Sequence, residues 1–242
     1  GVKEFSDSEI TLNDKAGINN KVLFNFSSNG GDSITAAGNA AANTLITGVD
    51  IRGGAGQDTF KLNVDGACGD KGLTIEGVNF DGGAGNDNLG IGFDNAQNVD
   101  ISGVTFTGGA GNDKVLLQIS GNTEDKNNTD GASITGLVVD GGEGDDEFDF
   151  FVGSGVEDSN HYGNYAPTLQ VAANGGAGND KFRLKMAGNE SKGEKAGVPA
   201  AEAVFTGGAG NDEFNIVALQ GKYYAAPDMN VAIDAGDGDD LV

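Results

Sequence analysis

The stretch that decides the fold is FTGGAGNDKV, residues 106–115, which places three glycines and an Asn-Asp pair within a few consecutive positions. Closely related letters occur six more times, as IRGGAGQDTF (51–60), FDGGAGNDNL (80–89), VDGGEGDDEF (139–148), ANGGAGNDKF (173–182), FTGGAGNDEF (205–214) and IDAGDGDDLV (233–242). The final Asp of one copy precedes the final Asp of the next by 29, 26, 33, 34, 32 and 28 residues. A nearly constant turn at varying intervals indicates an internal repeat whose length varies outside the turn.

Short strands are predicted on both sides of each turn. Downstream, apolar residues alternate with polar ones, most regularly in KFRLKM (181–186), which is the period of a strand with one buried face. The first apolar residue after each turn is Phe60, Leu89, Val115, Phe148, Phe182, Phe214 or Val242. Upstream, ITGVDI (46–51) and three similar segments carry a central Gly, which predicts a bend between two short strands. The polar segments between repeats differ in length and are predicted to be loops.

Two architectures fit this unit: a sandwich of antiparallel hairpins, or a parallel solenoid in which like positions stack about 4.8 Å apart. The residue after the final Asp favours the solenoid, because Lys114, Glu147, Lys181 and Glu213 would then form a column of alternating charge. One step along, Asp149 would lie beside Arg183. We therefore expect an all-β fold, a right-handed parallel β-helix of about seven to eight coils. Residues 1–242 are expected to form one β-solenoid domain, a fragment of a longer repetitive protein.

The composition is rich in glycine and strongly acidic. Gly accounts for 43 of 242 residues and the formal net charge is −23, so nucleic acid and anionic membrane surfaces are excluded as partners and cations are favoured. No run of about 18 apolar residues is present, so no membrane span is predicted. Cys68 is the single cysteine, so no disulfide can form within the chain, and we expect it to be a small buried residue.

Stacking the coils would also stack the final aspartates of the turns. At about 5 Å and an effective dielectric of ~20, two such charges repel by roughly 3 kcal/mol. No turn contains a Lys or Arg within its six letters, so the column needs another cation. Calcium fits best, because it accepts six to eight carboxylate and carbonyl oxygens in irregular geometry, whereas magnesium requires a stricter octahedron. One Cys and one His argue against zinc or copper. The alternative is that these turns form without metal, since Gly, Asn and Asp are good turn residues.

The motif GGAGND followed by an apolar residue two positions later resembles the GGxGxDxU nonapeptide of the RTX, or haemolysin-type, calcium-binding repeats. It differs in that family repeats follow one another every nine residues, whereas this chain has one motif per long coil. The resemblance implies a column of several calcium ions on one edge of a wider β-helix, held between consecutive turns. It implies carboxylate ligands at Asp58, Asp87, Asp113, Asp146, Asp180, Asp212 and Asp240. It also implies carbonyl ligands from the first residue of each turn, namely Gly53, Gly82, Gly108, Gly141, Gly175 and Gly207, and from the third, namely Ala55, Ala84, Ala110, Glu143, Ala177 and Ala209.

Three classes of function remain open. We expect a calcium-dependent structural module of an exported, extracellular or cell-surface protein, such as a surface layer, an adhesin or a matrix filament. Calcium would couple export to folding, and copies would self-associate through the ends of the coil stack or side by side. The alternative is a folding and secretion module of a secreted enzyme or toxin. A β-helix enzyme acting on carbohydrate is disfavoured, because only HYGNY (161–165) places an imidazole beside phenols. We therefore predict no enzymatic activity.

Overall fold

The computed structural model describes residues 3–5, 8–11, 21–27, 44–67, 73–97, 99–121, 132–153, 167–188, 198–220 and 226–242. All the regular elements in this part of the chain are β-strands, and they form two sheets. Sheet A contains β1 (Lys3–Phe5), β2 (Ser8–Thr11), β4 (Thr44–Ala55), β6 (Leu73–Ala84), β8 (Val99–Ser102), β9 (Thr105–Ala110), β11 (Ala132–Glu143), β13 (Thr168–Ala177), β15 (Ala200–Ala209) and β17 (Asp228–Asp237). Sheet B contains β3 (Lys21–Ser27), β5 (Thr59–Ala67), β7 (Asn88–Gln97), β10 (Lys114–Gly121), β12 (Glu147–Gly153), β14 (Lys181–Ala187) and β16 (Glu213–Leu219).

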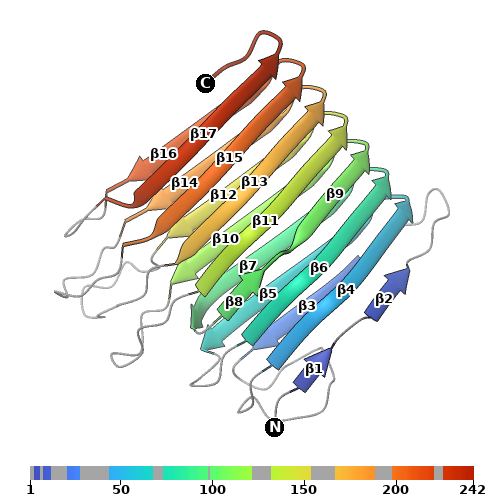
Figure 1. The fold of residues 1–242 in the computed structure, drawn as a ribbon, viewed down its shortest axis with the longest axis vertical. Coiled ribbons are helices and arrows are strands. Elements are labelled where there is room, and N and C mark those ends of the chain that lie inside the picture. The colour runs from blue at the N-terminus through green and yellow to red at the C-terminus, as the bar shows by residue number, and fades with distance from the viewer. Residues whose placement is uncertain are drawn as a thin grey trace.

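Neighbouring strands in each sheet come from consecutive repeats and run parallel. In sheet B the order is β3-β5-β7-β10-β12-β14-β16, and each described pair is parallel. Sheet A follows the same order of repeats from β4 to β17. The chain thus passes from sheet A through a glycine-rich turn to sheet B, and the turns line one edge of the molecule (Figure 1). The parallel β-solenoid is confirmed, and the hairpin sandwich is wrong.

The core lies between the two sheets and is built from stacked side chains of equivalent positions. Phe148, Phe182 and Phe214 follow the turns of three consecutive repeats, and their ring centroids are 4.7 and 4.8 Å apart. Each buried Phe contributes roughly 1.5–3 kcal/mol of transfer free energy, so a column of aromatic rings stabilises the register between coils. The prediction that the first apolar residue after the turn faces inward is confirmed for the first six positions. It is wrong for Val242, which is 75% exposed.

The glycine inside the upstream strand has the predicted effect on the backbone. Gly48, Gly77, Gly103 and Gly136 have φ of 59–63°, a left-handed conformation that side chains with a Cβ rarely adopt. At Gly103 the strand divides into β8 and β9, whereas β11 remains continuous with a register shift between Ile134 and Leu137 when it pairs with β13. The bend is therefore general, but it interrupts the strand in only one of these four repeats.

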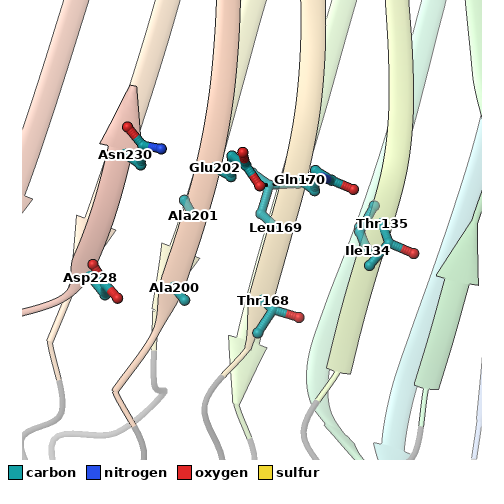
Figure 2. A pocket seen from close by; sticks show the side chains of 10 residues that line it. All are labelled: Ile134, Thr135, Thr168, Leu169, Gln170, Ala200, Ala201, Glu202, Asp228 and Asn230. Carbon is teal, nitrogen blue, oxygen red and sulfur yellow. Dashed lines mark hydrogen bonds between the residues drawn. The ribbon is translucent and has the colours of Figure 1, made fainter. Parts of the chain in front are cut away.

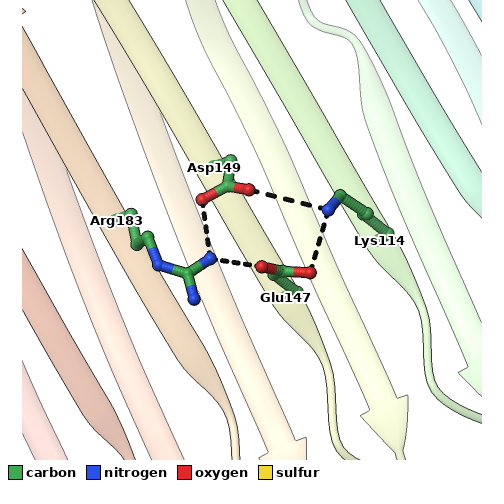
Figure 3. A network of polar contacts seen from close by, with 4 residues as sticks. All are labelled: Lys114, Glu147, Asp149 and Arg183. Atoms are coloured by element: carbon green, nitrogen blue, oxygen red, sulfur yellow. Dashed lines mark hydrogen bonds and ion pairs between the residues drawn. The ribbon is translucent and has the colours of Figure 1, made fainter.

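The outer face of sheet B carries the predicted charges, paired partly along the diagonal (Figure 3). Lys114 Nζ lies 2.9 Å from Glu147 Oε2 and 3.7 Å from Asp149, while Arg183 binds Asp149 at 2.9 Å and also donates to Glu147. Hydrogen bonds from Lys114 and Arg183 lower the pKa of Glu147. Lys181 is in register with Glu147 and with Glu213, but it forms no ion pair with any described residue, and Arg183 donates to Glu147. The predicted alternating column is therefore correct in register and only partly correct in pairing.

Candidate metal centre

The glycines of the turn are required for two different physical reasons. The second and fourth residues of the turn have φ of 93–108° and 127–152°, respectively, where only glycine is unstrained. The first residue instead lies against a neighbouring coil. A Cβ added to Gly108 would overlap Asp113 Oδ2 and would lie 2.6 Å from the carbonyl oxygen of Gly141. The sequence therefore fits a turn in which backbone atoms of adjacent coils approach closely at the first position.

The aspartates at the sixth position of the turn point into the solenoid rather than toward solvent. Six of them are 0–3% exposed, namely Asp58, Asp87, Asp113, Asp146, Asp180 and Asp212. In each gap between turns, Oδ1 of the later Asp accepts the backbone N–H of the earlier Asp at 2.6–2.9 Å. Asp240, which is partly buried, closes the series by accepting from Asp212 at 2.9 Å. The predicted column therefore exists as a continuous ladder of side chains, here called the aspartate column.

The second oxygen of these carboxylates has no hydrogen-bond partner. This holds for the buried Oδ2 atoms of Asp87, Asp113, Asp146, Asp180 and Asp212. Each Oδ2 approaches the first Gly of its own turn, at the same point that the carbonyl oxygen of the following turn approaches. From Gly82 to Gly175 this carbonyl lies 2.6–2.8 Å from the position of an added Cβ. Two kinds of acceptor oxygen therefore approach the same glycine, and no hydrogen-bond donor reaches these Oδ2 atoms.

Burial also disturbs the ionisation of these carboxyl groups. It raises the pKa to about 6 for Asp87, Asp113 and Asp180 and to about 7 for Asp146, despite the amide hydrogen bond that opposes the shift. Repulsion from neighbouring aspartates adds to the increase, and burial likewise raises the pKa of Asp212. Desolvated carboxylates are costly unless a cation or a proton neutralises them. The column is therefore a place where positive charge would be strongly stabilising.

A second ladder, which the sequence analysis did not find, runs along the outside of the turns. The side-chain Oδ1 atoms at the fifth position accept the backbone N–H of the fifth residue in the next coil at 2.7–3.1 Å. The acceptors are Asn86, Asn112, Asp145, Asn179 and Asn211. Its direction is opposite to that of the aspartate column, where the acceptor belongs to the later coil. The recurring Asn or Asp at this position was the available signal, because both side chains carry the same acceptor oxygen.

The predicted carbonyl ligands fall into two groups. The carbonyls of Gly82, Gly108, Gly141, Gly175 and Gly207 lie at the column, and the carbonyl of Ala235 takes the equivalent place beside Gly207. The third-residue carbonyls instead accept the N–H of the fourth residue in the preceding turn at 2.7–2.8 Å. Among the predicted ligands this applies to Ala84, Ala110, Glu143, Ala177 and Ala209. For Gly53 and Ala55, the turn that would come before them falls outside the described residues. The first-position carbonyls are therefore the better candidates for ligands.

No group of three or more Asp, Glu, His or Cys side chains that could hold a metal is found within the residues that the structure describes. A cation between two turns would consequently be bound by carboxylate and backbone carbonyl oxygens together, a donor set that suits calcium. The unpartnered Oδ2 atoms and the first-position carbonyl oxygens that approach the same glycine are donors of the kind that such an ion would need. His161 and Cys68 lie outside the described residues.

Comparison with protein-family models, with curated proteins and with solved structures found no match. Within the described part of the chain, no helix is long and apolar enough to cross a membrane.

Proposed function

We propose that this chain is a calcium-dependent structural module of an exported cell-surface or matrix protein. In this proposal it is a right-handed solenoid of seven to eight coils, with one RTX-like turn per coil and calcium ions along the aspartate column. The parallel stacking of consecutive repeats supports the proposal, because it brings equivalent turns next to one another. Extracellular calcium modules bind in the range of 10⁻⁴–10⁻³ M, so such a rod would become rigid outside the cell.

The observation that carries the proposal is the choice of Asp over Asn at the sixth position. Asn has the same shape, and its Oδ1 would accept the same backbone N–H. Its amide nitrogen would then donate toward the first-position carbonyl of the next coil, whereas Asp presents a second acceptor there. A metal-free turn accounts for the glycines and for Oδ1, but it leaves the second oxygen without a role. A divalent cation would satisfy both converging oxygens.

Calcium binding and folding would be coupled in such a column. Neighbouring carboxylates about 5 Å apart repel by roughly 3 kcal/mol at an effective dielectric of ~20, so the stack is opposed by its own charge when no cation is bound. Each bound ion would add RT ln(1 + [L]/Kd) to the stability of the folded state. The protein would therefore be loosely folded or unfolded in a chelator and well folded in calcium.

The test is a calcium titration of the chelator-treated protein, followed by circular dichroism and isothermal titration calorimetry. We expect a calcium-induced gain of β-structure and several bound ions per chain, with a much weaker response to magnesium at the same concentration. Asp146→Asn should lower the number of ions bound, while Asp145→Asn, which removes the neighbouring exposed charge, should leave it unchanged. A spectrum and a melting temperature that are identical in calcium and in EGTA would refute the proposal.

A further inference from the structure

The two outer faces of the solenoid differ in charge over the same coils. On sheet A, the strands β11, β13, β15 and β17 contain no Lys or Arg, and their outward acids before the turns are Asp140, Glu202, Asp228 and Asp234, with Glu143 and Asp237 exposed in the turns. On sheet B, β14 alone presents Lys181, Arg183 and Lys185 on successive outward positions. A protein with a net charge of −23 thus concentrates positive side chains on one face.

The acidic face contains a hollow into which a cationic side chain would fit (Figure 2). Its volume is about 430 Å³, and its lining includes Gln170, Glu202, Asp228 and Asn230. Ala200 stands between Thr168 and Asp228 in the sheet register, so a small side chain leaves room between larger polar ones. Gln170 donates its side-chain N–H to Glu202 Oε2 at 3.3 Å, and its Oε1 accepts the N–H of Gly136. The charged acceptors of the hollow are therefore the carboxylates of Glu202 and Asp228.

The opposite face presents two lysines that are not used within the described chain. Lys114 and Arg183 are engaged with Glu147 and Asp149, as Figure 3 shows. Lys181 and Lys185 are exposed and form no ion pair with another described residue, although the Lys185 ammonium lies 5.9 Å from the centre of the Phe151 ring. These two side chains are therefore available to a partner with negative charge.

The acidic hollow and Lys185 lie at the same distance along the strands from the glycine-rich turns. Lys185 is the fifth residue after Asp180, and Glu202 is the fifth before Gly207, so each is about 17 Å from its turn at about 3.3 Å per residue. Lys181 directly follows Asp180, and Asp140 directly precedes Gly141. If a second copy lies beside the first with its turns at the same level, each of these lysines faces one of these acids of the neighbouring copy, offset by about one strand spacing.

We propose that the solenoids associate side by side, with sheet B of one copy on sheet A of the next, and that Lys185 enters the acidic hollow of its neighbour. The contact uses different faces of the two copies, so it does not close into a dimer but extends into a layer. Both copies carry a net negative charge, but ionic screening limits the repulsion between them to distances of about 8 Å at physiological salt. The charged side chains that meet in the contact lie within this distance and therefore govern the association. This inference deepens the proposed function and rests on it, since a layer of rods is one form of surface coat.

Association is measured by sedimentation velocity of the calcium-loaded protein over a range of protein and NaCl concentrations. We expect open-ended association that weakens as salt increases. Lys181→Glu with Lys185→Glu should weaken it at least about tenfold, and so should Glu202→Lys with Asp228→Lys. An equimolar mixture of these two variants should recover open-ended association with the two variants alternating, because each face of one variant is then complementary to a face of the other. Lys61→Glu and Glu76→Lys, which are single charge reversals elsewhere on the same two faces, should have little effect.

The result that would overturn the inference is a calcium-loaded wild type that remains monomeric, or association that the paired variants leave unchanged. Equal weakening by the two control variants would also overturn it, since net charge rather than the hollow would then govern association. Circular dichroism of every variant separates this outcome from failure of the proposed function, which would appear as folding that is independent of calcium. If a charge-reversal variant does not fold, Lys185→Ala and Glu202→Gln make the same comparison with smaller changes.

Discussion

Asp146→Asn provides the sharpest test of the aspartate column, because its effect on stability should change sign with calcium. Burial raises the pKa of Asp146 to about 7 from an ordinary value of 3.8. A difference of about 3 units corresponds to roughly 4 kcal/mol that opposes folding with this group ionised above pH 7. Asn carries no charge, and its amide can add a hydrogen bond of about 0.5–1.5 kcal/mol to the carbonyl of Gly175. In EGTA at pH 8 the variant should therefore be more stable than the wild type by roughly 5 kcal/mol.

In saturating calcium the order should reverse. Asp146 offers Oδ2 to the gap after its own turn, while its Oδ1 lies at the gap before it, so the substitution weakens ion binding beside the turn at residues 141–146. Urea denaturation of both proteins measures the difference in calcium. In EGTA, where the wild type is expected to unfold toward pH 8, circular dichroism over a pH titration measures it, and the variant should stay folded to a higher pH than the wild type. Asp145→Asn is the matched control, because it removes the same charge one residue away and its Asn oxygen keeps the outer ladder. If Asp146→Asn is destabilising to the same extent in both conditions, the carboxylate is not a calcium ligand and the reasoning fails.

Three further predictions follow from the same geometry. In EGTA, the raised pKa values of the buried aspartates mean that their contribution to stability is fully present below about pH 3.8 and is lost as the pH rises through about 6–7, so circular dichroism should detect folding on acidification and unfolding toward pH 8. Gly108→Ala should lower the free energy of unfolding by about 1–3 kcal/mol in urea titrations, because its Cβ overlaps Asp113 Oδ2 and crowds the Gly141 carbonyl. Gly90→Ala, whose Cβ would meet only the Lys61 side chain at 3.4 Å, should be neutral or slightly stabilising. Arg183→Ala should cost at most about 1 kcal/mol, and less in high salt, since its ion pairs are partly exposed to solvent; a larger loss would show that the network is more strongly coupled than its exposure implies.

The stacking of the coils could be predicted from the sequence because it depends on repetition alone. Equivalent turns recur, the apolar position after each turn is constant, and Asp149 and Arg183 have the charges expected of neighbours in register. Parallel pairing of β12 with β14 then follows, and the structure has it with Glu147 opposite Lys181. Ion pairing along the diagonal could not be predicted in the same way. Arg183 is long enough to reach either acid of the next strand, so its choice depends on side-chain geometry that a register does not specify.

The residues of the candidate site could be predicted from the sequence, but the hydrogen bonding and orientation of their side chains could not. The sequence indicated a column of sixth-position carboxylates, and the structure has them stacked. It did not indicate that one oxygen of each would be occupied by a backbone N–H, or that Asn at the fifth position would form a ladder in the opposite direction. Both features arise from the path of the turn, in which the amide of the fifth residue donates to the outer ladder and the amide of the sixth donates to the aspartate column. That path is a three-dimensional property, and composition alone gives no access to it.

The hydrogen bonds of the aspartate column explain why a cation bound there would act on the whole stack rather than on one turn. Asp146 is joined to Asp113 through its Oδ1 and to Asp180 through its backbone N–H, so every buried carboxylate is positioned by the coils on both sides. An ion that orders one aspartate therefore also orders its backbone N–H, which holds the carboxylate of the next coil in place. Part of the entropy cost of ordering the adjacent turn is then already met. In a solenoid whose stability is a sum of coil and nearest-neighbour terms, such coupling lies in the neighbour term. Loading would then spread from occupied gaps to adjacent ones, and the acids that oppose stacking without metal would make the transition with metal steeper.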